Sequence, residues 1–129
     1  DVGIALEVGI ASDVPGGKKE ESQEMLGKGP SILMYDASMI PNLKLRNLFI
    51  DIAKEQNIPF QFSIMERGGT DAGSIHITMK GVPSIVIGVP CRYIHSHSGI
   101  IHRDDYDNAV KLLTAVVKKL DTKVVEELT

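Results

Sequence analysis

Short apolar runs recur along the chain and alternate with segments of helical periodicity. Residues 2–10 are apolar at both even and odd positions except at Glu7, and residues 31–35 form a second run. Residues 83–89 are rich in β-branched side chains and end before Pro90. Short apolar runs of this kind, bounded by proline, indicate buried strands rather than helices.

Residues 60–65 show a different pattern, because apolar and polar side chains alternate there. This period of two predicts a half-buried strand. The apolar side chains are Phe60, Phe62 and Ile64, and the polar ones are Gln61 and Ser63. Residues 100–101 are two consecutive isoleucines and predict a further short strand.

Residues 42–56 have helical periodicity, with Asn42 as the expected N-cap and Pro59 preventing continuation. A long helix is expected from Asp104 or Asp105, one of which would cap it, to about Leu120. The stripe expected to be buried on the first helix is Leu45, Leu48, Phe49, Ile52 and Ala53. The stripe expected on the long helix is Tyr106, Ala109, Val110, Leu113, Val116, Val117 and Leu120.

A shorter helix is expected over residues 74–80, ended by Gly81. Residues 11–30 read as a long loop, with a charged stretch at 18–24. Strands thus alternate with helices along the chain. This order predicts an α/β domain with a mostly parallel sheet flanked by helices.

Composition narrows the classes of function. The chain has 129 residues, so we expect at most one domain. A net charge of −3, no basic block and no tryptophan argue against nucleic acid as a partner. No apolar run reaches the ~20 residues of a membrane span. One cysteine excludes an intrachain disulfide and fits a reducing compartment, so a cytoplasmic location is expected.

Polar side chains gather where two predicted strands end. Residues 91–97 follow the strand at 83–89, and residues 68–73 follow the strand at 60–65. Open α/β sheets place their binding sites at the carboxyl ends of strands, so these two segments predict a polar cleft.

Several side chains in these two segments and elsewhere in the chain allow more than one interpretation. Glu7 is either an edge carboxylate facing water or paired with arginine, or a metal ligand. His95 and His97 lie two residues apart. They are either metal ligands or part of a loop exposed to solvent. Cys91 is either a nucleophile or a small buried hydrophobe. His76 is expected to be packed or to cap its helix.

The sequence lacks the motifs of several other kinds of metal site and active site. There is no His-Glu-x-x-His sequence, and a single cysteine excludes a thiolate zinc cage. Asp104 and Asp105 could be taken for the carboxylate pair of a glycosidase, but helix capping explains adjacent acids at a helix start. His102 is expected to pair with one of them.

Five segments resemble a known family, in the same order and at similar spacing. They are EVGIASDVPG at 7–16, GKGP at 27–30, GTDAGSIH at 69–76, GVPS at 81–84 and RYIHS at 92–96. They look like the carboxyl-terminal half of the dinuclear-metal aminopeptidases of the glutamyl aminopeptidase and tetrahedral (TET) peptidase type. Some members of this family carry the label endoglucanase M or cellulase.

This resemblance implies a pair of zinc or cobalt ions, held by a His, a bridging Asp, a Glu, a further acidic residue and a late His. Glu7 matches the further acidic residue and His95 the late histidine, each serving a different metal. The family's general base is a Glu of a Glu-Glu pair, which activates a metal-bound water. Gly69, Thr70 and Asp71 would line the cleft. Arg92 and Tyr93 would orient the substrate or pack behind His95.

The resemblance also implies that part of the site lies elsewhere. Glu20-Glu21 and Glu126-Glu127 lie in the wrong contexts for the catalytic pair, and no match to the first His or the bridging Asp is present. We therefore expect residues 1–129 to be a partial metallopeptidase catalytic domain, without the upstream part and the inserted dimerisation domain. This chain alone should be inactive.

The longer protein would act on peptide substrates and form a homo-oligomer, from a dimer to a dodecamer, without nucleic acid or membrane partners. Two alternatives stay open. One is a non-catalytic α/β binding module, and the other is a glycosidase, as some family labels state.

Overall fold

The computed structural model describes residues 1–18 and 23–128. Residues 19–22, with Glu20 and Glu21 and most of the predicted charged stretch, lie outside the described residues. The elements are β1 (Gly3–Ile10), β2 (Ser31–Asp36), α1 (Leu43–Glu55), β3 (Gln61–Met65), α2 (Asp71–Ile75), β4 (Ser84–Arg92), β5 (Ile100–Ile101), α3 (Arg103–Lys119) and α4 (Thr122–Glu127).

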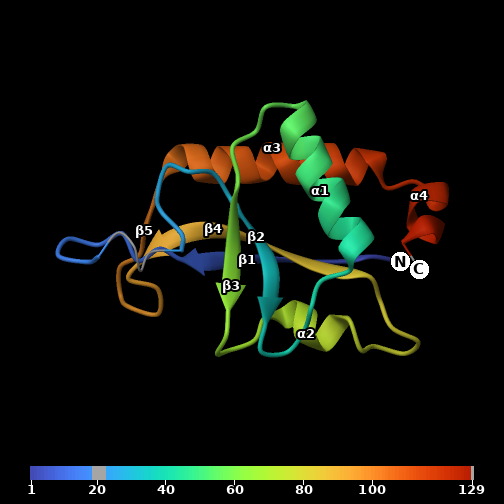
Figure 1. Ribbon diagram of the computed structural model, residues 1–129, viewed down its shortest axis with the longest axis horizontal. Coiled ribbons are helices and arrows are strands. Elements are labelled where there is room, and N and C mark those ends of the chain that lie inside the picture. The colour runs from blue at the N-terminus through green and yellow to red at the C-terminus, as the bar shows by residue number, and fades with distance from the viewer. Residues whose placement is uncertain (19–22, 129) are drawn as a thin grey trace.

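The strands form one mixed sheet with the order β1-β4-β2-β3, and β5 pairs with β4 (Figure 1). β1 pairs with β4 in parallel along its whole length, and β2 pairs with β3 in parallel. β4 meets β2 in an antiparallel pairing of Ser31 with Gly88 and Ile32 with Ile87. The predicted α/β fold, with a mostly parallel sheet flanked by helices, is confirmed.

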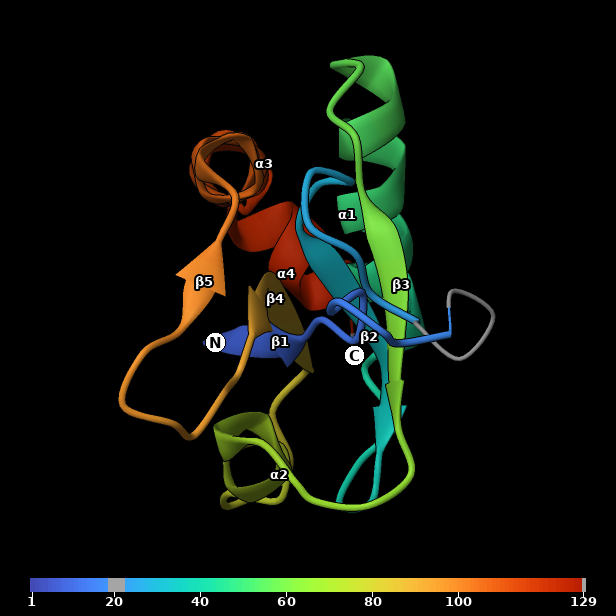
Figure 2. The ribbon, with the colours of Figure 1, turned by 90° about the vertical axis from the view of Figure 1, so that its left-hand side faces the viewer.

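The helices divide between the two faces of the sheet (Figure 2). α1 and α3 contact each other and β4 on one face, whereas α2 contacts β1 and β4 on the other. The main core lies under α1 and α3 and includes Ile32, Leu45, Phe49, Ile85, Leu112 and Val116, all fully buried. Burying each such side chain stabilises the fold by roughly 1.5–3 kcal/mol. A smaller cluster under α2 contains Ala5, Leu33, Met39, Ala72 and Val86.

The first long helix agrees with its prediction. The Asn42 side chain caps α1 by accepting a hydrogen bond from the Leu45 amide at 2.9 Å. Leu45, Phe49, Ile52 and Ala53 are buried. Asn57 adopts a positive φ of 52° directly after the helix, a backbone conformation that asparagine tolerates at helix ends.

The prediction for α3 is wrong in two respects. The N-cap is His102, whose Nδ1 accepts from the Asp104 amide at 3.2 Å, rather than either aspartate. The buried residues of α3 are Asp105, Leu112 and Val116, whereas Tyr106, Val110 and Val117 are about half exposed. α3 carries apolar side chains on two adjacent faces, and only one of them packs on β4 and α1.

β4 is longer than expected, because it continues through Pro90 to Arg92. Gly3 and Ala11 donate to the carbonyls of Pro83 and Cys91, so odd-numbered residues of β4 bond to β1 and Pro90 faces the other side. On that side β2 pairs with β4 only at Ile87 and Gly88, and β5 pairs with it only at Cys91 and Arg92. Proline is tolerated there because no ladder hydrogen bond needs its missing N–H.

The burial predicted for β3 is reversed. Ser63 is buried, whereas Phe62 and Ile64 are 47% and 40% exposed. Ser63 turns inward because its hydroxyl donates to Glu24 Oε1 at 2.6 Å. β3 is an edge strand of the described sheet, and its Ile64 amide donates to the Gln23 side chain at 3.2 Å (Figure 2).

α2 is displaced from its prediction over 74–80, because it spans Asp71–Ile75. After Ile75 the chain turns, and Met79 has a positive φ of 54° that a helix cannot contain. Within the described residues, no helix has the length and apolar character needed to cross a membrane.

Candidate active site

A cavity of about 210 Å³ lies on the α2 side of the sheet. It is lined by strands β1, β2, β3 and β4, by the segment before β2 and by the residue before α2, including Glu7, Gly9, Glu24, Leu33, Ser63 and Thr70. Gly9 leaves room for the Glu24 carboxylate, because a Cβ atom at that position would lie 1.8 Å from Glu24 Oε2 and would force it to move. The floor of the cavity therefore combines apolar strand residues with carboxylates and hydroxyls.

Glu7 is the predicted metal ligand that lines this cavity. Its Oε1 accepts a hydrogen bond from the Asp71 amide at 3.2 Å. The carboxylate accepts no hydrogen bond from any arginine among the described residues. The pairing with arginine is thus wrong. β1 is an edge strand of the described sheet and Glu7 is half-buried, so an edge carboxylate facing water and a metal ligand both stay open as interpretations.

The 69–71 segment is held in place by Asp36, a residue that sequence reasoning missed. Asp36 Oδ2 accepts from the Thr70 amide at 3.1 Å and from the Thr70 hydroxyl at 2.7 Å. Its Oδ1 accepts from the amides of Ser38 and Met39 at 2.7 and 2.8 Å. The available signal was an aspartate at a strand end followed two residues later by serine, a pattern typical of side-chain turns.

The ionised form of Asp36 is favoured. Burial raises its pKa, but hydrogen bonds from Ser38 and Thr70 outweigh burial, so that the pKa lies below its ordinary value. Gly73 lets this turn approach α2, because a Cβ there would lie 2.0 Å from the Ser38 hydroxyl. Asp36 thus fixes Thr70 at the cavity wall.

The three predicted substrate-binding residues of this segment differ in position. Thr70 lines the cavity. Asp71 has an exposed side chain and reaches the site through its backbone amide, which donates to Glu7. Gly69 packs against Ser38 rather than against the cavity.

Arg92 is engaged by another side chain. Its Nε and Nη2 donate to the two carboxylate oxygens of Asp13 at 3.0 and 2.8 Å. This hydrogen-bonded guanidinium holds the pKa of Asp13 below its ordinary value, although burial acts in the opposite direction. Asp13 also accepts from the Leu26 amide at 3.2 Å. The pair therefore ties the end of β4 to the loop after β1.

His95 lies in the exposed loop beyond β4. Both Tyr93 and His95 have positive φ angles, 59° and 63°, which are uncommon for such residues and typical of functional loops. The Ser96 hydroxyl donates to the Tyr93 carbonyl at 2.6 Å and closes this turn. The loop geometry, rather than packing, therefore sets the direction of His95.

The structure does not bring Glu7 and His95 into one complete metal centre. Among residues 1–18 and 23–128, no group of three or more His, Cys, Asp or Glu side chains could hold an ion. A carboxylate and an imidazole are suitable donors for zinc or cobalt, but zinc needs four ligands. The two residues fit part of a donor set.

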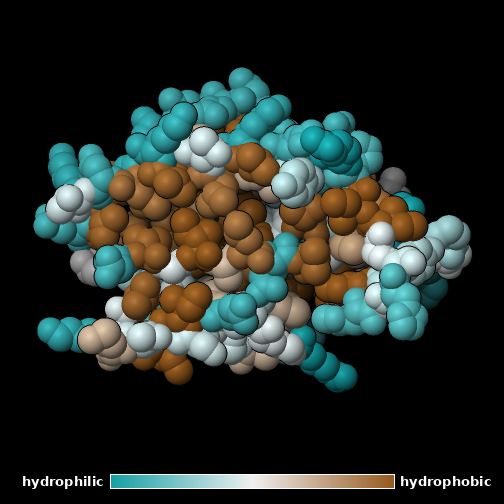
Figure 3. Space-filling view, turned by 180° about the vertical axis from the view of Figure 1, so that it is seen from behind, coloured by the Kyte–Doolittle hydropathy of each residue, from teal (hydrophilic) through white to brown (hydrophobic). Residues whose placement is uncertain are grey.

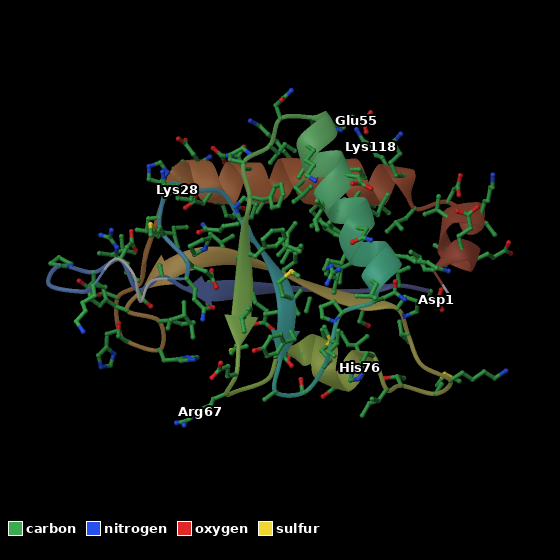
Figure 4. The ribbon with its side chains drawn as sticks, viewed as in Figure 1. Asp1, Lys28, Glu55, Arg67, His76 and Lys118 are labelled. Carbon is green, nitrogen blue, oxygen red and sulfur yellow. The ribbon has the colours of Figure 1, made fainter. Side chains whose placement is uncertain are left out.

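Most of the remaining candidate residues have structural roles, and the structure reveals no role for His97. His76 lies at the end of α2 (Figure 4), where its Nδ1 is 3.3 Å from the Ala72 carbonyl, in agreement with the capping reading. Cys91 is buried and free, which agrees with the small-hydrophobe reading. His97 is exposed. Asp105 is 1% exposed and its oxygens accept from Gly27 and Gly29, so Asp104 and Asp105 do not form a glycosidase pair.

Comparison with known proteins places these observations in a family. The model of the M42 glutamyl aminopeptidase family matches residues 1–112. The chain belongs to this family. The predicted resemblance is therefore confirmed, and residues 7–16, 27–30, 69–76, 81–84 and 92–96 lie within the matched range.

Relatives and solved structures agree with the family assignment. The chain is 36% identical over 128 residues to a glutamyl aminopeptidase of Lactococcus lactis, covering 99% of this chain and 35% of the relative. It is 37% identical over 122 residues to a lysyl aminopeptidase of Pyrococcus furiosus, covering 91% and 34%. The structure matches that of a TET aminopeptidase from a Thaumarchaeota archaeon with a TM-score of 0.95 and 49% identity, covering 100% and 36%.

A more distant M42 structure adds information on assembly. The TET1 peptidase of Pyrococcus horikoshii, which can assemble into a tetrahedron or a large octahedral shell, matches with a TM-score of 0.69 and 27% identity, covering 88% and 32%. In all these comparisons the chain spans about a third of the length of the protein it matches.

Proposed function

We propose that this chain is part of the catalytic domain of a two-metal aminopeptidase, which removes amino-terminal residues from peptides. The observation that carries the proposal is the position of Glu7. This carboxylate lies within a parallel strand, accepts a hydrogen bond from the Asp71 amide and lines the cavity, in a family whose named relatives are aminopeptidases.

In the proposed enzyme Glu7 and His95 each bind a different ion, zinc or cobalt. When bound, the two ions supply a water molecule that is activated to attack the peptide carbonyl. The other residues of this chain hold groups of the site in place and do not transfer protons. The Asp71 amide orients Glu7, and Asp36 holds Thr70 at the cavity wall.

The substrate-binding role of Gly69, Thr70, Asp71 and Arg92 remains a prediction. Thr70 is the one of the four that lines the cavity and could meet a substrate there. Arg92 is better suited to positioning, because its pairing with Asp13 fixes the strand end from which the His95 loop leaves.

Residues 1–129 are proposed as a partial domain. A Glu-Glu pair in the family's context, the bridging Asp and the first His have no counterpart in the sequence. We therefore expect no chelator-sensitive peptidase activity from this chain alone. The whole protein is proposed to be cytoplasmic and to form homo-oligomers, as the TET1 peptidase does. One relative is named a glutamyl aminopeptidase and another a lysyl aminopeptidase. The amino-terminal residue that the whole protein prefers therefore stays open.

The proposal can be tested in a chimera. This chain would replace the matching part of the Thaumarchaeota TET aminopeptidase, with which it shares 49% identity. The chimera should hydrolyse aminoacyl chromogenic substrates, and a chelator should abolish that activity. Glu7→Ala and His95→Ala should each lower kcat/KM by at least about 100-fold, because each removes a direct metal ligand.

The matched control is His97→Ala, which removes a second exposed histidine of the same loop and should change kcat/KM by less than about 3-fold. A folded chimera without activity would favour the non-catalytic binding module. Full activity in the Glu7→Ala variant would remove Glu7 from the site.

A further inference from the structure

The cavity beside Glu7 contains a second carboxylate, that of Glu24, which the proposed metal site does not use. Glu24 lies in the segment before β2, and only 3% of its surface is exposed. Its Oε1 accepts a hydrogen bond from the hydroxyl of Ser63 at 2.6 Å, and Ser63 is itself buried in β3. The Glu24 carboxylate is therefore held at a fixed place in the cavity wall.

Small residues on three neighbouring strands leave space in front of this carboxylate. Gly9, Gly88 and Ser31 line the cavity from β1, β4 and β2. Gly88 lies opposite Ser31 in the strand pairing, and a Cβ atom at Gly88 would lie 2.5 Å from the Ser31 hydroxyl oxygen. A Cβ atom at Gly9 would displace the Glu24 carboxylate. Glycine within a strand often marks a place where a ligand approaches closely, so these positions favour a ligand group beside Glu24.

The cavity is suited to a cation. The ionisable residues that line it are Glu7 and Glu24, and among the residues that the structure describes no lysine, arginine or histidine does so. When Glu7 binds the proposed ion, the negative charge of the cavity wall comes from Glu24. Because a buried carboxylate forms its strongest hydrogen bonds with a cationic donor, an ammonium or guanidinium group is the ligand that this wall favours.

The size of the cavity fits one long side chain. Its volume of about 210 Å³ is smaller than the roughly 300–1,000 Å³ of pockets that enclose whole ligands. Gly9, against which Glu24 lies, follows Glu7 by two residues, a rise of about 6.6 Å along a strand. Leu33 and Met65 add apolar lining. Lysine and arginine combine an apolar stem with a charged end, so their side chains match both parts of the cavity.

We infer that this cavity binds the side chain of the substrate's amino-terminal residue, and that Glu24 selects lysine or arginine there. The Glu24 carboxylate accepts hydrogen bonds from the cationic end of that side chain, and Ser63 orients the carboxylate. A glutamyl side chain is rejected, because it would place a further carboxylate against Glu24. The inference rests on the proposed aminopeptidase function and names its class of substrate, which the names of the relatives leave undecided.

Kinetics of the TET aminopeptidase chimera on lysyl, leucyl and glutamyl p-nitroanilides test the inference. The value of kcat/KM should be at least about 30-fold higher for the lysyl than for the leucyl substrate, and lowest for the glutamyl one. Glu24→Gln should lower the ratio of the lysyl to the leucyl value by at least about 30-fold, because it removes the charge and keeps the shape. A variant that is merely misfolded would lower both values and leave their ratio unchanged.

The matched control is Glu55→Gln, because Glu55 is exposed at the end of α1, which packs on the face of the sheet opposite α2 (Figure 4). It should change the ratio of the lysyl to the leucyl value by less than about 2-fold.

A binding measurement separates this inference from the proposed activity. Calorimetric titration of the chimera with L-lysinol and L-leucinol, amino alcohols without a bond to cleave, requires no turnover. Lysinol should bind at least about 10-fold more tightly than leucinol, and Glu24→Gln should remove the difference. A chimera that lacks peptidase activity but keeps this preference would support the cation site and contradict the proposed function.

Three results would overturn the inference. The first is a leucyl or glutamyl substrate with the highest kcat/KM, together with equal binding of the two amino alcohols. The second is an equal loss on lysyl and leucyl substrates in Glu24→Gln, which would assign Glu24 to the α-ammonium group that both substrates share. If Glu24→Gln does not fold, the unmutated chimera decides, because the absence of any preference for lysyl over leucyl ligands is the third.

Discussion

At the scale of single residues, Asp36 holds Thr70, one of the predicted residues that line the cavity. Its two oxygens accept hydrogen bonds from Thr70, Ser38 and Met39, and the side chain is 6% exposed. A carboxylate with this many donors stays ionised in the folded state. Asp36 therefore both stabilises the folded chain and holds Thr70 in position.

Asp36→Asn should lower the free energy of unfolding by about 2 kcal/mol at pH 7, because an amide nitrogen replaces an oxygen that donors face. The folded-state pKa is lowered, so this stabilisation is present above the unfolded pKa and is lost as pH falls through the folded one. The difference from the native chain should thus shrink below about pH 4. Denaturant unfolding of both proteins across pH measures it.

The matched control is Asp51→Asn, because Asp51 is exposed on α1. It should change the free energy of unfolding by less than about 0.5 kcal/mol at any pH. Equal losses from both substitutions would show that Asp36 is not the organising carboxylate.

The sequence identified some of these residues and not others for a physical reason. Thr70 follows a predicted strand, where topology alone brings groups to a cleft, and the structure places it at the cavity. Glu7 lies within β1, and only the family resemblance singled it out as a metal ligand. The partner of Arg92 could not be predicted, since Asp13 lies 79 positions away and no local pattern marks the pair. Long-range pairings of polar side chains depend on tertiary structure.

At the scale of elements, α3 shows where periodicity is insufficient. The stripe predicted for α3 included Val116 but not Leu112. The structure buries both beside Asp105 and leaves Val110 and Val117, which the prediction buried, half exposed. A helix with two apolar faces has two possible orientations. Asp105 helps to select one, because its carboxylate accepts from Gly27 and Gly29 at 2.7 Å each.

Asp105→Ala should therefore destabilise the chain by about 3 kcal/mol, since it leaves two backbone amides without a partner in a site that is almost fully buried. Asp104→Ala is the matched control from the same helical turn, and its side chain is 77% exposed. It should cost less than about 0.5 kcal/mol. Chemical denaturation gives both values, and equal values would contradict the anchoring role of Asp105.

At the scale of the whole molecule, one sheet presents two different faces. The face under α2 holds the cavity with Glu7, and the face under α3 holds an apolar groove of about 630 Å³ between β1 and α3, on the side where Figure 3 shows hydrophobic surface. The alternation of strands and helices was enough to predict the α/β architecture. It did not reveal that β1 is an edge strand or that β4 continues through Pro90, because both depend on which strands are neighbours in the sheet.

The central claim is that this chain supplies one ligand to each of two metal ions. The metal content of the purified TET aminopeptidase chimera, measured by mass spectrometry after dialysis, tests it most directly. The account predicts about two zinc or cobalt ions per polypeptide, about one in each of the Glu7→Ala and His95→Ala variants, and two in His97→Ala. Two ions in both ligand variants would contradict the claim.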